Sequence, residues 1–246
     1  MKTLKSTLAL LALVLFVASC GAKGSTVETS DAKEVASAAE ATALAVNVDN
    51  SIVTWIGSKP AGKHNGTIDI SAGEIKVSGN EIVAGNFVID ITSLKSLDIP
   101  ADNENNAKLV GHLMSADFFD AATHSTATFE VTSVAVFNAA DVAADNEEFK
   151  TDFAPAKMSE IMVANPTHMI SGNLTMRGTT KNITFPASVS IADGVIKAAA
   201  NFNINRTDWG LMYGDEASAV DKAKDQFIYN TVNVGFSLEA GTSATM

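Results

Sequence analysis

The stretch Ile170-Ser-Gly-Asn-Leu-Thr-Met-Arg-Gly-Thr-Thr-Lys-Asn-Ile-Thr-Phe185 decides the fold. It predicts a β-hairpin, because strand side chains alternate with a period of two, so that Leu174 and Met176 share one face. The turn contains Gly178, which can adopt a positive φ angle. The returning strand alternates in the same way, and Pro186 ends it or places it at an edge. Any β-sandwich could carry such a hairpin, so the rest of the chain must decide the architecture.

Similar alternation recurs from Val46 to Leu238, in about eight segments that are joined mostly by short turns. This arrangement predicts an antiparallel meander, and a sheet of that length tends to close because closure removes its edges. No segment resembles a βαβ unit, which makes a Rossmann fold improbable. The sequence therefore predicts an all-β protein, with a closed barrel whose interior is either filled by side chains or able to hold one small ligand.

Two regions depart from the strand pattern. Residues 108–120 follow a polar loop and place Leu109, Leu113 and Met114 at helical spacing. We expect one or two helical turns there, laid over one end of the sheet. Residues 138–165 are less regular, and we expect an excursion between strands that carries a short strand or a turn of helix.

The N-terminus has the features of an export signal. Lys2 and Lys5 precede an apolar run that is too short for a comfortable transmembrane helix and that ends in small residues. The sequence Val17-Ala-Ser-Cys20 resembles a bacterial lipobox, in which the cysteine becomes the acylated first residue of the mature protein. An ordinary signal peptide with a chance cysteine is the alternative.

These features suggest a domain plan. Residues 1–19 would be a lipoprotein signal peptide, and residues 20–45 an acylated Cys20 followed by a flexible tether, since this segment lacks aromatic residues. We expect the barrel domain over residues 46–240 and a C-terminal tail over 241–246. Gly21 is not the aspartate that retains some lipoproteins at the inner membrane. We therefore expect a lipid-anchored protein of the bacterial cell envelope that faces the periplasm, at the outer membrane rather than the inner one.

The composition argues against several classes of function. The formal net charge of −11 disfavours nucleic acids and anionic membrane surfaces as partners. The single cysteine excludes an intrachain disulfide and a cysteine-rich metal site. The four histidines lack metal-ligand spacing, and the chain has neither a nucleophile elbow nor a P-loop. We expect no metal, no cofactor and no catalytic activity.

Four segments carry a family resemblance in the same order: His64-Asn-Gly, residues 112–120, residues 172–181 and residues 205–210. Together they resemble the YceI-like family of bacterial periplasmic proteins. The resemblance implies an extended, lipocalin-like antiparallel β-barrel with a long apolar cavity, in which characterised members bind polyisoprenoid chains such as isoprenoid quinones. The chain departs from the family pattern at residues 123–125, where members often carry Tyr-Pro, and at Trp209, where a phenylalanine is usual. These departures leave the length of the cavity and its ligand open.

A lipid site of this kind needs a dry apolar tube with a few polar groups at its mouth. Leu113, Phe118 and Phe119 could cap one end, and Trp209 or Tyr213 could face a head group. The candidate lining residues are Phe87, Ile89, Ile91, Phe129, Val131, Leu174, Met176, Phe202, Ile204, Val234 and Phe236. The alternative is that these residues fill a closed core, and a one-residue register error would exchange the two faces of each strand.

Arg177 and Arg206 recur in the family segments. They could contact a polar or anionic head group, or could simply stabilise turns and form ion pairs. The functional prediction is binding, sequestration or transport of an isoprenoid lipid by a protein that an N-terminal acyl group holds at the membrane. An envelope-stress interaction lipoprotein with a packed barrel is the alternative. An enzyme acting on bound lipid would need titratable groups that converge inside the cavity. A homodimer is left open.

Overall fold

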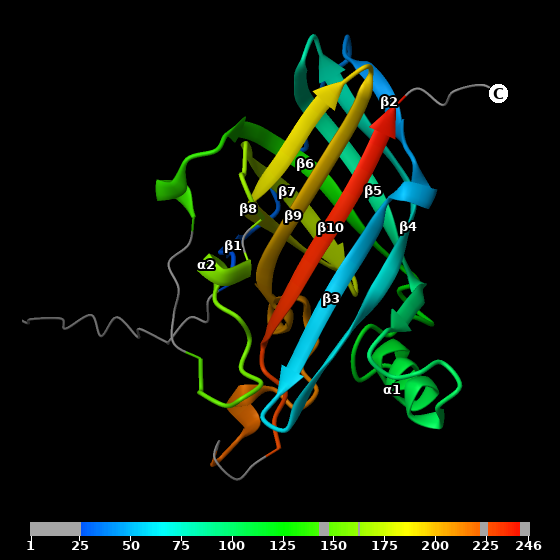
Figure 1. Ribbon diagram of the computed structural model, residues 1–246, viewed down its shortest axis with the longest axis vertical. Coiled ribbons are helices and arrows are strands. Elements are labelled where there is room, and N and C mark those ends of the chain that lie inside the picture. The colour runs from blue at the N-terminus through cyan, green and yellow to red at the C-terminus, as the bar shows by residue number, and fades with distance from the viewer. Residues whose placement is uncertain (1–25, 143–147, 162, 222–225, 242–246) are drawn as a thin grey trace, which may run out of the picture.

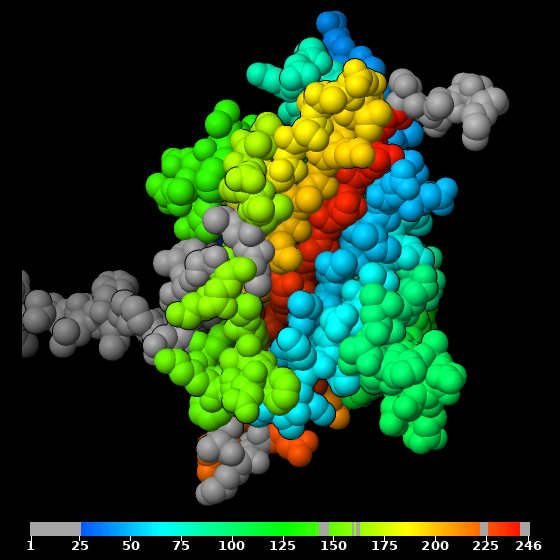
Figure 2. Space-filling model, in the orientation of Figure 1, coloured from blue at the N-terminus to red at the C-terminus, as the bar shows by residue number. Residues whose placement is uncertain are grey.

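The computed structural model describes residues 26–142, 148–161, 163–221 and 226–241. Eight strands run in chain order, each antiparallel to the next, and the last pairs with the first to close a barrel (Figure 1). This confirms the predicted all-β, antiparallel barrel of about eight strands with a short helix near one end. The strands are β3 (Ile52–Lys59), β4 (Gly62–Ser78), β5 (Glu81–Ser96), β6 (Thr126–Val136), β7 (His168–Met176), β8 (Thr179–Ala192), β9 (Val195–Asn205) and β10 (Thr231–Gly241). In Figure 2, β9, β10 and β3 form a continuous outer surface.

The hairpin predicted from the sequence is the pair β7 and β8. Its two-residue loop places Arg177 at φ 46° and Gly178 at φ 72°, the left-handed conformations that such tight loops require. Pro186 does not end the strand, because β8 continues to Ala192. The proline falls between the stretch of β8 that pairs with β1 (Thr29–Ser30) and the stretch that pairs with β9, a gap where a residue without an N–H is tolerated.

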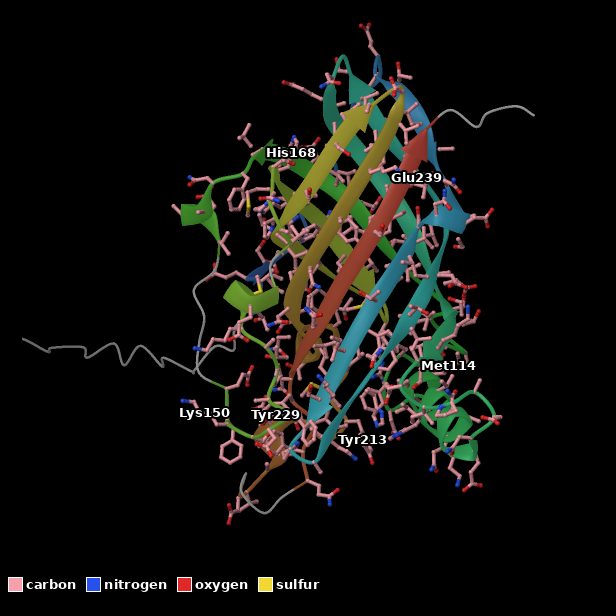
Figure 3. The ribbon with its side chains drawn as sticks, in the orientation of Figure 1. Met114, Lys150, His168, Tyr213, Tyr229 and Glu239 are labelled. Atoms are coloured by element: carbon pink, nitrogen blue, oxygen red, sulfur yellow. The ribbon has the colours of Figure 1, made fainter. Side chains whose placement is uncertain are left out.

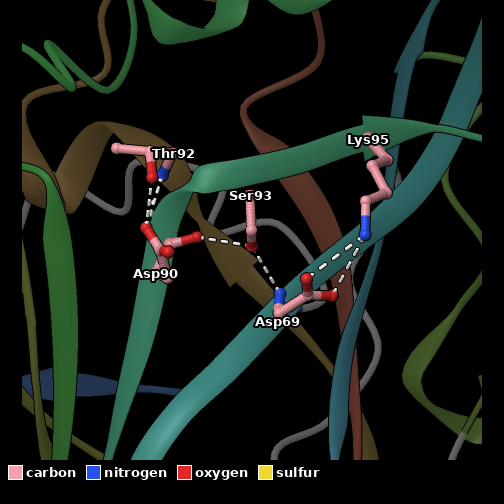
Figure 4. A network of polar contacts seen from close by, with 5 residues as sticks. All are labelled: Asp69, Asp90, Thr92, Ser93 and Lys95. Atoms are coloured by element: carbon pink, nitrogen blue, oxygen red, sulfur yellow. Dashed lines mark hydrogen bonds and ion pairs between the residues drawn. The ribbon is translucent and has the colours of Figure 1, made fainter.

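A bulge separates β4 from β5 on one side of the barrel. Between two paired positions, β5 carries the four residues 91–94 where β4 carries Ile68 alone. Ser93 holds the extra backbone in place, since its hydroxyl donates to the carbonyl of Asp90 at 2.7 Å and accepts from the N–H of Asp69 at 2.7 Å (Figure 4). The bulge bends β5 away from a regular ladder.

The N-terminal belt, residues 26–46, wraps the outside of the barrel. The N–H of Val27 donates to the carbonyl of Asn203 on β9, and the N–H of Ala36 donates to the carbonyl of Val131 on β6. The belt ends in β2 (Thr42–Val46), which pairs with β4 and β10. The expected tether over residues 20–45 is therefore wrong for the part that the structure describes, because residues 26–45 belong to the folded domain.

In the part of the chain that the structure describes, two helices lie outside the barrel. Helix α1 (Glu104–Met114) begins earlier than the sequence predicts, because Asn103 caps it by accepting a hydrogen bond from the N–H of Asn105. Helix α2 (Met158–Ile161) lies in the excursion and packs against β9, where the N–H of Asn203 donates to the sulfur of Met158. Single 3₁₀ turns occur at Val48–Asn50, Ala139–Asp141, Arg206–Trp209 and Glu216–Ser218. No helix among the described residues has the length and apolar character needed to span a bilayer.

Five phenylalanine rings from five strands meet across the middle of the barrel. We call Phe87, Phe129, Phe185, Phe202 and Phe236 the phenylalanine layer. Neighbouring ring centroids lie between 4.2 and 5.9 Å apart, and the tightest pair, Phe185 with Phe202, is stacked at 7°. On β7, Gly172 leaves the room that the ring of Phe129 occupies, because a Cβ at residue 172 would lie 2.2 Å from that ring.

We expect Gly172→Ala to destabilise the protein by about 1–3 kcal/mol, because the added methyl forces the Phe129 ring out of its position. Gly57→Ala is the matched control on β3, since a Cβ there meets nothing within 4 Å. Urea denaturation of both variants measures the difference. Equal stability of the two variants would contradict the close packing described for the layer.

Candidate functional site

A cavity of about 670 Å³ occupies the half of the barrel nearer α1. Its wall is mainly apolar and comes from seven of the eight barrel strands, together with α1 and the loop that follows it. Because of the bulge in β5, Ile91 and Leu94 both reach this wall although their separation breaks the alternation of inward and outward residues. The cavity is of a size that suits a small hydrophobic ligand.

Nine of the predicted cavity residues lie at this wall. They are Ile89, Ile91, Leu113, Phe118, Phe119, Leu174, Met176, Ile204 and Val234. Among the predicted head-group residues, Arg206 and Tyr213 also lie there. The wall includes residues that the sequence did not single out, notably Trp55 and Ile68 on the neighbouring strands β3 and β4. Both lie on inward positions of strands that the sequence predicts, so their alternation is the signal that could have identified them.

The other predicted lining residues do not reach the cavity. Phe87, Phe129, Phe202 and Phe236 point inward as expected but belong to the phenylalanine layer, where their rings pack on one another. Val131 is buried in the core outside the cavity wall. The packed barrel considered as the alternative therefore describes one half of the interior, and the half nearer α1 is hollow.

Trp209 does not face the cavity. Its side chain has no exposed surface, and its indole N–H donates to the backbone carbonyl of Leu174 at 2.9 Å. The expectation that Trp209 meets a head group is wrong, because the 3₁₀ turn that begins at Arg206 directs the indole into the core. The ring instead fixes that turn against β7.

Arg206 is buried at the cavity wall with its donors directed at backbone. The guanidinium donates to the carbonyls of Tyr229 at 3.1 Å and Ile228 at 3.0 Å, and also to the carbonyl of Leu211. Burial lowers the pKa of Arg206, an effect that the charges of Asp215 and Glu216 oppose. The residue ties together the two segments that line the cavity mouth, which is the structural role considered for it from the sequence.

Arg177 lies outside the cavity. Its guanidinium donates to the carbonyl of Gly210 at 2.9 Å and to the carbonyl of Ala116 at 2.7 Å. It joins the β7–β8 turn to the loop after α1 and to the 3₁₀ turn at 206–209. This arrangement matches turn stabilisation rather than contact with a head group.

The rim of the cavity carries the polar groups. Tyr213 is 47% exposed, and its ring lies 4.6 Å from the ring of His112, which in turn pairs with Asp117 at 3.0 Å. Figure 3 shows Tyr213 at the α1 end of the barrel, with Glu239 at the opposite end. His64 lies at the rim as well, paired with Asp98 at 2.7 Å. The sequence contained both histidines within the four family segments, but their spacing gave no sign that they share a rim.

Asp98 organises this part of the rim. Burial raises the pKa of its carboxyl. Hydrogen bonds from the N–H of Asn65, from His64 and from Ser96 together lower the pKa by more than burial raises it, so the net pKa lies below the ordinary value. The carboxylate is thus ionised at neutral pH, and it links the end of β5 to the β3–β4 hairpin.

One polar atom in the wall is unsatisfied. The indole nitrogen of Trp55 is buried and, among the described residues, it is the side-chain polar atom found without a hydrogen-bond partner. An unpaired buried donor costs about 1–3 kcal/mol. No cluster of three or more His, Cys, Asp or Glu residues that could hold a metal ion occurs in the described parts of the chain.

We expect Arg206→Lys to destabilise the protein by about 2–4 kcal/mol, because an ammonium group cannot reproduce the three-way fork to backbone carbonyls. Arg177→Lys is the control, since that side chain is partly exposed and its loss should cost about 1 kcal/mol or less. Thermal denaturation compares them. A larger loss for Arg177→Lys would refute the structural role assigned to Arg206.

The barrel is similar to solved structures of other proteins. The crystal structure of BcnA from Burkholderia cenocepacia is similar with a TM-score of 0.53 and 18% sequence identity, over 79% of this chain and 99% of that one. A structure of a polyisoprenoid binding domain from Saccharophagus degradans, implicated in plant cell wall breakdown, gives a TM-score of 0.49 and 20% identity over 82% of this chain and 99% of that one. No curated protein matches the chain.

The family comparison covers most of the sequence. The YceI-like domain matches residues 32–240, so the match begins inside the N-terminal belt and ends in β10. This start agrees with the structure, in which the belt is part of the folded domain. The chain belongs to the YceI-like domain family.

Proposed function

We propose that this protein binds an isoprenoid lipid, such as a polyprenol or an isoprenoid quinone, with the hydrocarbon tail in the cavity. The observation that carries the proposal is the hollow half of the barrel, which has an apolar wall and polar groups at its rim. An amphiphile with one apolar chain and one polar end matches this apolar wall and polar rim. Membership of the YceI-like family supports the same class of ligand through the resemblance drawn from the sequence.

The energetics suit such a ligand. Burying one five-carbon isoprene unit is worth on the order of 4 kcal/mol gross, at about 0.8 kcal/mol for each carbon group. Association and ordering of the ligand remove much of this gain. A few buried units therefore suffice for useful affinity without any hydrogen bond to the tail, which is consistent with the apolar wall.

The head group would meet the rim rather than the two arginines. Tyr213, His112 and His64 combine partial exposure with polar atoms at the cavity wall, whereas the guanidinium of Arg177 lies outside it. Their phenol and imidazole groups can donate hydrogen bonds to an acceptor on the ligand. A carbonyl or hydroxyl group is the simplest partner for donors of this kind.

The rim histidines have no catalytic role in this proposal. His64 and His112 are each paired with a carboxylate, and both pairs lie at the rim rather than deep in the cavity. A reaction on the bound lipid would need titratable groups beside the buried tail, where the wall is apolar. We therefore propose sequestration or transport of the lipid without catalysis.

The proposed cellular setting follows from the N-terminal sequence. Cys20, in the lipobox-like Val17-Ala-Ser-Cys20, would carry the acyl anchor and hold the barrel at the periplasmic side of the outer membrane. Both Cys20 and the expected signal peptide lie outside the described residues. The residue-241–246 tail also lies outside them, apart from Gly241, which ends β10.

The binding test uses protein made in a bacterial host with its export signal. We expect mass spectrometry of the extracted lipids to recover an isoprenoid lipid, and delipidated protein to take up an added prenol or isoprenoid quinone. Val234→Trp should weaken uptake by at least about tenfold, because the larger ring fills the cavity. Val136→Trp is the matched control, since Val136 is 80% exposed at the end of β6 and does not line the cavity.

Two results would count against the proposal. One is repeated recovery of protein that contains no lipid and takes none up. The other is an equal effect of the two tryptophan substitutions, because binding would then not depend on the cavity. Circular dichroism of both variants checks that the barrel is intact.

The anchor is tested separately. Growth with an alkyne-labelled palmitate should label the full-length protein, and Cys20→Ala should abolish the label, because no other cysteine is present. Membrane fractionation of the two forms reports whether the label anchors the protein. Labelling that persists in Cys20→Ala would overturn the lipoprotein assignment.

A further inference from the structure

The phenylalanine layer lies just beyond the inner end of the cavity, and none of its five residues belongs to the wall. On three strands an inward residue belongs to the layer while the next inward residue, one step nearer the mouth, lines the cavity. These pairs are Phe87 and Ile89 on β5, Phe202 and Ile204 on β9, and Phe236 and Val234 on β10. On each of these strands the change from the packed half to the hollow half therefore falls within one inward step.

The layer leaves little room for a tail to pass. Phe87, Phe129, Phe185 and Phe202 are each at most 7% exposed, and the five rings form an unbroken series of contacts from β5 to β10. Gly172 shows how tightly the layer fills its level, because the Phe129 ring occupies the space of the missing side chain. Packed aromatic rings of this kind cannot be displaced without loss of many contacts.

The depth of the cavity follows from β3. Lining residues run from Val53, which pairs with Phe236 on β10, to Lys59 at the end of the strand. Six residue steps cover about 20 Å along a strand, and less along the axis of a tilted barrel. An extended chain advances about 1.2 Å per backbone bond, so an isoprene unit with four such bonds spans about 5 Å. The cavity thus matches a tail of about three or four units.

We propose that the phenylalanine layer is a length stop, which makes the protein selective for isoprenoid tails of about three or four units. This inference rests on the proposed lipid-binding function and specifies its substrate class. Within the layer, Phe236 is the residue that we expect to limit how far a tail can enter. It touches Phe87 and Phe185, and it pairs across the sheet with Val53, which lines the cavity.

The test offers delipidated protein an equimolar mixture of geraniol, farnesol, geranylgeraniol and solanesol, which have two, three, four and nine isoprene units. The protein is re-isolated, and mass spectrometry measures the bound prenols. We expect the natural protein to retain farnesol and geranylgeraniol over solanesol by at least about tenfold. Phe236→Ala should open a path beyond the layer and reduce that ratio to about one.

Leu238→Ala is the matched control. It truncates an inward, buried residue of the same strand, but behind the layer, so it should leave the preference for tail length unchanged. Phe236→Leu is a milder variant that serves if Phe236→Ala does not fold, and it should shift the ratio in the same direction.

The outcomes separate the two proposals. Retention of solanesol as strongly as farnesol by the natural protein would overturn the length stop and leave lipid binding standing. So would a ratio that neither substitution of Phe236 changes, or one that Leu238→Ala changes equally. Failure to retain any prenol would overturn the proposed function and the length stop together.

Discussion

The pairing of β10 with β3 is the interaction on which the rest of the structure depends. These strands carry the last and first segments of the meander, and their hydrogen bonds remove the two edges that an open sheet would expose. β10 also contributes to both halves of the interior, through Phe236 in the packed half and Val234 in the hollow half. The closed ladder therefore sets the diameter across which the aromatic rings meet.

Side-chain hydrogen bonds satisfy irregular backbone at the end of the barrel nearer α1. At the end nearer α1, Arg206 satisfies carbonyls of chain segments that carry no regular sheet pairing, and Asp98 joins a strand end to a hairpin. Such bonds keep irregular backbone satisfied close to an apolar space, where an unpaired carbonyl would be costly. The mouth can remain open because side chains there form the backbone hydrogen bonds that neighbouring strands form elsewhere in the barrel.

Alternation in the sequence was enough to predict the strands, the closed barrel and the inward direction of residues such as Phe87 and Phe202. It could not predict the depth at which the interior becomes hollow. Phe87 and Ile89 share one face of β5, but Phe87 packs against other rings whereas Ile89 lines the cavity, and that difference depends on residues of other strands. Trp209 lies in a short turn without periodicity, so nothing local determines which way its ring points.

The belt was missed for a related reason. Its composition is typical of a tether, and it is held by backbone hydrogen bonds and a few apolar contacts such as those of Val27 and Leu44, which composition does not reveal. Arg206 was identified as a candidate, but its partners are carbonyls of residues up to 23 positions away. A backbone acceptor leaves no mark in the sequence, so a structural arginine and a ligand-binding one look alike.

The belt has a consequence for the geometry of anchoring. Val27 is fixed to β9, and only seven residue steps separate it from Cys20, a contour of at most about 25 Å. With Cys20 acylated as proposed, the barrel could not swing freely through the space beyond the bilayer. The side of the barrel formed by β8 and β9 would stay close to the lipid head groups. A lipid would then have to move only a short distance between the bilayer and the cavity.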